Sequence, residues 1–250
     1  MPRAPLPALK PRRLPRRNAA LRIFRLVAKH HRAVATDRAL AIILAGIAGA
    51  ANAGGFILLG SYTSHMTGYL SALADNIALQ NLAFVLQSLL AITLFILGAA
   101  TSALTINWAR AHAPKQQYSL PLSLQGALLI TLAELSKFPL PAAIGHALSL
   151  GLLCFIMGLQ NATITKISYA RIRTTHATGM ITDIGIELGR AAYGRAFHSP
   201  VTADRAKLTL LLQLLASFLI GGIIGAFGYS WAGFAFSLPL AAILLAMAVL

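Results

Sequence analysis

Six long apolar runs constrain the fold of this chain more than any other feature of its sequence. Several of them reach the roughly 20 apolar residues that a helix needs to cross a bilayer, and they carry no charge. With 57% hydrophobic and only 11% charged residues, the chain does not fit a single soluble core. The sequence therefore predicts an all-α integral membrane helical bundle with six transmembrane helices, over residues 39–60, 82–107, 120–135, 141–165, 208–228 and 232–250.

Two further stretches, residues 66–78 and 175–192, have helical character but differ from the six runs. The first is short and contains Asp75, and the second contains Asp183, Glu187 and Arg190. We expect both to form short re-entrant or interfacial helices rather than full spans.

The distribution of basic residues predicts the orientation, because short cytoplasmic loops carry the excess of Lys and Arg. Eleven of the 21 basic residues precede Ala39, and six spans with a cytoplasmic N-terminus leave only Lys137 outside. We therefore expect a bacterial inner-membrane protein with both termini in the cytoplasm. The net charge of +15 would also suit nucleic acid, but its position beside the first run favours anionic lipid headgroups as the partner of a basic, Pro-rich tail at residues 1–38.

The two halves of the membrane region share three sequence patterns in the same order. Gly-Ala-Ala-Asn-Ala at 49–53 matches Gly-Leu-Gln-Asn-Ala at 158–162, and Ser-His-Met-Thr-Gly at 64–68 matches Thr-His-Ala-Thr-Gly at 175–179. Ser-Leu-Pro-Leu at 119–122 recurs at 237–240. The pattern predicts two repeats, residues 39–136 and 137–250. Because each would hold three spans, an odd number, the second repeat would be inverted, as in many secondary transporters.

These patterns resemble those of the YoaK family of bacterial multi-pass membrane proteins, a family of uncharacterised function. The resemblance covers residues 39–250 and implies about six spans without an established substrate. Members commonly have Asn after the first Thr-Gly, where this chain has Tyr69.

The repeated polar residues are the candidate substrate-binding site. Imidazoles donate, accept and titrate near neutral pH, and hydroxyls cap helix N-termini, whose free N–H groups attract anions. Amides inside spans must find polar partners, which makes them either contacts between helices or contacts to a substrate. Asp183 suits a cation or proton site, a pair with Arg190 or a helix cap. The candidates are Asn52, Ser64, His65, Thr67, Gly68, Gln160, Asn161, Thr175, His176, Thr178, Gly179 and Asp183.

Three function classes fit the sequence. Transport of a small polar solute or ion between the inverted repeats agrees best with the symmetric polar residues, whereas a membrane scaffold with the tail as contact surface is the alternative. An intramembrane enzyme fits less well, because no nucleophile motif, metal motif or nucleotide loop is present. We therefore expect no enzyme activity, no catalytic residues, no metal and no cofactor. A homo-oligomer is compatible with the sequence.

Overall fold

The computed structural model describes residues 34–167 and 177–249, and each regular element in these ranges is a helix. The all-α prediction is thus confirmed for the described residues, whereas residues 1–33 of the predicted tail lie outside them. The helices in chain order are α2 (Val34–Leu59), α3 (Met66–Ala78), α4 (Leu82–His112), η2 (Pro114–Gln116), α5 (Ser119–Leu135), α6 (Ala142–Ile167), α7 (Ala177–Ala196), α8 (Arg205–Ala232), η3 (Gly233–Phe236) and α9 (Ser237–Val249).

Four helical segments among the described residues are long and apolar enough to cross a membrane. They coincide with α2, α4, α6 and the continuous stretch from α8 to α9. Helix α5 is apolar but has only 17 residues, about 26 Å at 1.5 Å per residue, against a hydrocarbon thickness of about 30 Å. These four segments cover five of the six predicted spans, because the fourth, Arg205–Val249, contains both the 208–228 run and residues 232–249 of the last run, and the six-span layout remains a prediction.

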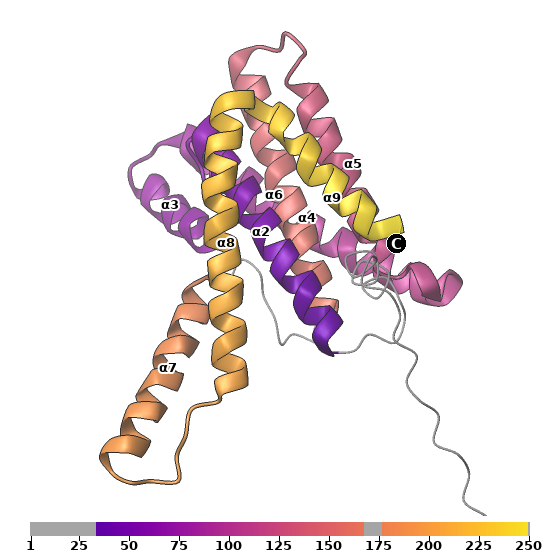
Figure 1. The fold of residues 1–250 in the computed structure, drawn as a ribbon. Coiled ribbons are helices and arrows are strands. Elements are labelled where there is room, and N and C mark those ends of the chain that lie inside the picture. The colour runs from indigo at the N-terminus through magenta and orange to yellow at the C-terminus, as the bar shows by residue number, and fades with distance from the viewer. Residues whose placement is uncertain (1–33, 168–176, 250) are drawn as a thin grey trace, which may run out of the picture.

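Helices α2 and α8 pack side by side over much of their length (Figure 1). The packing is close because small residues line the contact. A Cβ on Gly49 would overlap the carbonyl oxygen of Phe218, and a Cβ on Gly221 would overlap the carbonyl oxygen of Gly46. This agrees with the small-residue contacts that drive helix association in lipid, where no hydrophobic force favours it.

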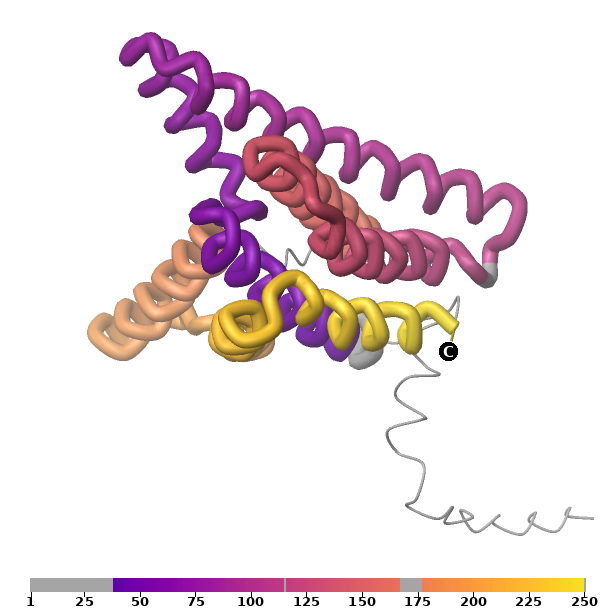
Figure 2. Tube along the Cα trace, turned by 90° about the horizontal axis from the view of Figure 1, so that it is seen from above, coloured from indigo at the N-terminus to yellow at the C-terminus, as the bar shows by residue number. Residues whose placement is uncertain are grey.

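Helices α4 and α6 form a second close pair. A Cβ on Gly98 would overlap the carbonyl oxygen of Phe155, and one on Gly158 would overlap the carbonyl oxygen of Phe95. Seen from above, α4 lies along one side of the bundle, and α8 and α9 lie along the opposite side (Figure 2). Each half of the chain therefore packs its longest helix against the other half.

The outward faces of the long helices are apolar. Trp231 on α8 is 91% exposed, and Phe227 and Ile224 on the same helix are also exposed. Leu104 and Trp108 make a comparable face on α4. Such continuous exposed apolar surface suits lipid as the solvent. The core between the helices is instead built largely of Ala, Leu and Gly.

The repeated Ser-Leu-Pro-Leu segments occupy the same structural position in both halves. One begins α5 at Ser119 and the other begins α9 at Ser237, and proline is tolerated there because the first helical turn needs no N–H donor. Before α9 the chain bends at Gly233, whose φ of 56° favours glycine. The hydroxyls of Tyr229 and Ser237 lie 2.9 Å apart and fasten the bend.

Candidate functional site

The segment between α2 and α3 turns back along α2. Asn52, which is buried, accepts two hydrogen bonds at its Oδ1, from the backbone N of Ser64 at 3.1 Å and from its hydroxyl at 3.0 Å. Because Asn52 lies about two turns before the end of α2, this contact holds the start of α3 well below that end. His65 is the N-cap residue of α3, and its side chain makes no capping hydrogen bond.

A pocket of about 640 Å³, which we call the central pocket, lies at the start of α3. Both halves of the chain contribute to its lining. The first half provides the predicted motif residues and part of α4, and the second half provides the end of α6 and the start of α7. The lining residues are Ser64, His65, Met66, Thr67, Phe95, Ala99, Asn161, Ala162, Thr165, Lys166, Ala177 and Thr178.

Helix α6 presents a polar face to this pocket. Asn161 donates from Nδ2 to the carbonyl of Met157 at 3.0 Å, and Thr165 donates to the carbonyl of Asn161 at 2.7 Å. Lys166 is the charged side chain among the described lining residues. Thr165 and Lys166 were not among the sequence candidates. Thr165, four residues after Asn161, shares its helix face, and this spacing is the signal that would have found it.

Gln160 lies in the core instead. Its Oε1 accepts from Nε2 of Gln125 at 2.7 Å, and its Nε2 donates to the carbonyl of Leu44. The side chain is fully buried and joins α6 to α5 and α2. The structure thus gives Gln160 the role of a contact between helices.

The remaining candidates fall in three places. Gly68 lies beneath the ring of His65 in the first turn of α3, and Gly179 is half-buried in the first turn of α7. Asp183 lies further along α7 and pairs with Lys207 of α8, at 3.4 Å, rather than with Arg190. Thr175 and His176 lie outside the described residues.

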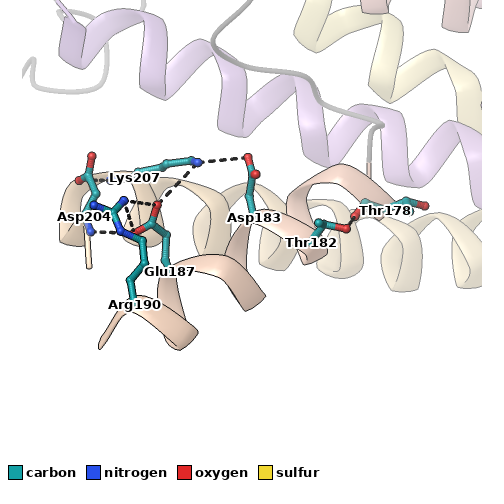
Figure 3. A network of polar contacts seen from close by, with 7 residues as sticks. All are labelled: Thr178, Thr182, Asp183, Glu187, Arg190, Asp204 and Lys207. Atoms are coloured by element: carbon teal, nitrogen blue, oxygen red, sulfur yellow. Dashed lines mark hydrogen bonds and ion pairs between the residues drawn. The ribbon is translucent and has the colours of Figure 1, made fainter. Parts of the chain in front are cut away.

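The ion pair of Asp183 belongs to a polar network that joins α7 to α8 (Figure 3). At its centre is Glu187, which is only 2% exposed. This carboxylate accepts from the backbone N of Asp204 at 2.9 Å and from Arg190 Nη1 at 3.3 Å, and Lys207 Nζ lies 3.7 Å away. Asp204 in turn caps α8 by accepting from the backbone N of Lys207. The network fixes α7 beside the first turns of α8.

Long apolar helices, with a pocket that both halves of the chain line, are the features of a helical membrane protein. The chain belongs to the DUF1275 family, described as proteins of unknown function, whose model matches residues 40–250. This assignment is consistent with the resemblance to the YoaK family. No curated protein and no solved structure matches the chain.

Proposed function

We propose that this protein is a transporter of small polar solutes and that the central pocket is its solute site. The observation that carries the proposal is the composition of the lining. The predicted motif residues His65 and Thr67 from the first half meet Asn161 and Thr178 from the second half around one volume. A site shared by two repeats is the arrangement that alternating access requires, because motion of one repeat against the other exposes the same site to either side.

The packing of the long helices supports an internal two-fold relation between the halves. Gly49 and Gly158 are equivalent in the sequence repeat, and each packs on a phenylalanine carbonyl, of Phe218 and Phe95 respectively. Exchanging the halves converts the contact of α2 with α8 into the contact of α6 with α4. The reciprocal contacts of Gly221 and Gly98 obey the same exchange.

The inverted layout completes the proposal. Equivalent helices α2 and α6 run in opposite directions in the bundle (Figure 1), which suits an axis in the membrane plane. With α5 and α9 as the two shorter spans, the chain crosses the inner membrane six times and keeps both termini in the cytoplasm. Helices α3 and α7 are then the two half-helices, and both begin at the central pocket.

The lining favours neutral or anionic solutes over cations. Lys166 contributes a positive charge, and Ser64, Thr67, Thr165 and Thr178 contribute hydroxyl groups. No carboxylate is present among the described residues of the lining. A pocket of about 640 Å³ lies within the range of small-molecule sites.

Uptake into proteoliposomes tests this function. The full chain is reconstituted and offered radiolabelled phosphate, acetate, glycerol and rubidium in separate experiments. We expect protein-dependent uptake of at least one anion or of glycerol, and a several-fold loss with Thr67→Val and with Thr178→Val. Gly185→Ala is the matched control, since a Cβ there meets nothing within 4 Å.

Two results would contradict the proposal. One is uptake no greater than that of empty vesicles for every probe. The other is uptake that both threonine substitutions leave unchanged, which would remove the central pocket from the pathway.

A further inference from the structure

A second, smaller pocket adjoins the central pocket. It has a volume of about 150 Å³ and is named here the side pocket. Its lining comes from the turn after α2 and from α3, and consists of Ser61, Tyr62, His65, Gly68, Tyr69 and Ala72. Within residues 34–167 and 177–249, His65 is the one residue that lines both pockets. Its side chain, which is exposed, therefore borders both volumes.

The ring of His65 packs at a defined position on α3. It folds back over the first helical turn and lies against Gly68, where an added Cβ would overlap Cδ2 of the imidazole and lie 2.7 Å from Nε2. Any side chain at position 68 would displace the ring, because real Cβ contacts are never that short. This contact gives a steric reason for the spacing of His and Gly in the His-x-Thr-Gly motif.

We propose that His65 is a partition between the side pocket and the central pocket, and that Gly68 holds its ring in the separating position. Displacement of the ring changes the opening between the pockets, so His65 determines the size of solute that passes. This selective role rests on the proposed transport function. The partition itself is a property of the fold and can be measured without a transported solute.

A thiol placed in the central pocket measures the partition directly. Cys154 is the only cysteine of the chain, and it is fully buried. The reporter is therefore Ala99→Cys in a Cys154→Ala background, since Ala99 lines the central pocket from α4. A membrane-impermeant charged methanethiosulfonate is applied to the full chain in sealed vesicles, from each side in turn, and the labelling rate is recorded.

The expected result is a dependence on the size of residue 65. His65→Ala opens the partition and raises the labelling rate from one side about tenfold, which corresponds to an access barrier about 1.4 kcal/mol lower. His65→Phe keeps a ring of similar size and leaves the rate close to that of the parent. An unchanged rate in His65→Ala from both sides would overturn the proposal.

The role of Gly68 is tested by its dependence on His65. Gly68→Ala displaces the ring and alters the labelling rate several-fold, whereas the same substitution added to His65→Ala has no further effect, because no ring remains to be displaced. An equal change in labelling rate from Gly68→Ala with and without His65 would overturn the role of Gly68 in holding the ring. If Gly68→Ala does not fold, the comparison of His65→Ala with His65→Phe still decides the partition.

The labelling result and the uptake result separate the two ideas. Labelling that follows residue 65 in a protein without uptake would retain the partition and reject transport. Uptake by a protein whose labelling rate does not depend on residue 65 would support transport and reject the partition.

Discussion

Asn52 on α2 accepts both hydrogen bonds that Ser64 donates, from its backbone N and from its hydroxyl. This amide holds the end of the loop between α2 and α3 against α2, and together with the backbone bond from Ser61 to Gly55 it sets the depth at which α3 begins. It also places His65 and Thr67, the next residues with polar side chains, at the central pocket. An asparagine within an apolar helix, which would otherwise be an unfavourable residue, thus determines the geometry of the site.

Substitution of Asn52 by Leu should loosen this loop. Two hydrogen bonds are lost, each worth about 1 kcal/mol net, so we expect the free energy of unfolding to fall by about 2 kcal/mol. Ser64→Ala removes only the hydroxyl bond and should have about half the effect. Thermal unfolding in detergent, followed by the fraction that stays monodisperse, measures both. Equal stability of Asn52→Leu and the parent would show that the loop is held by other contacts.

The close helix contacts predict a paired effect of two distant glycines. Gly49→Ala and Gly158→Ala each force a methyl group against a backbone carbonyl, and overpacking of this kind costs about 1–3 kcal/mol. Gly189→Ala on α7 is the control, where the added Cβ meets nothing within 4 Å and helix propensity favours alanine. The same unfolding assay applies. A large effect at one position only would argue against the two-fold relation of the halves.

Glu187 should be the residue that holds α7 to α8. Glu187→Ala leaves the backbone N of Asp204 without its acceptor and Arg190 without its carboxylate, whereas Lys207 keeps Asp183, so we expect a loss of about 1–3 kcal/mol. Asp183→Ala removes only a solvent-exposed pair and should cost under about 1 kcal/mol. Trypsin cleavage after Arg195 and Arg205 reports release of α7. Similar cleavage rates in the two variants would contradict a central role for Glu187.

Lys166 should control the charge preference of the pocket. If the central pocket carries the solute, Lys166→Gln removes an attraction of about 1 kcal/mol for an anion and lowers the initial rate of anion uptake several-fold at low salt. Glycerol uptake should change little, because it carries no charge. The difference between the two probes should shrink as salt is raised. A parallel loss of both probes would indicate that Lys166 supports the fold rather than the preference.

The sequence located most helices well because apolar runs end where Gly, Pro and polar residues gather. The predicted short helix at residues 66–78 is α3, and the predicted run at 82–107 lies within α4. The predicted run at 208–228 extends at both ends to become α8, whose N-cap at Asp204 lies beyond the apolar residues. Hydropathy alone does not register such polar turns.

The site was predictable only in part, because sequence patterns give residue types and spacing but not the direction in which each side chain points in the folded bundle. Asn161 and its neighbour Gln160 were both predicted site residues, yet Asn161 lines the pocket and Gln160 joins three helices in the core. Successive residues on a helix point about 100° apart, so adjacency does not imply a shared face. Lys207, the partner of Asp183, is distant in sequence and had no local signal.

The packing of each half's long helices against helices of the other half has a consequence for biosynthesis. Helix α2 makes its main contact with α8, and α4 makes its main contact with α6, so neither half of the chain contains the surface on which its longest helix packs. During synthesis α2 must remain in the bilayer, with lipid against its small-residue face, until most of the chain has been inserted. Assembly of this pair is therefore a late event, and truncation before α8 leaves α2 without its main partner, with only its smaller contact with α6 remaining.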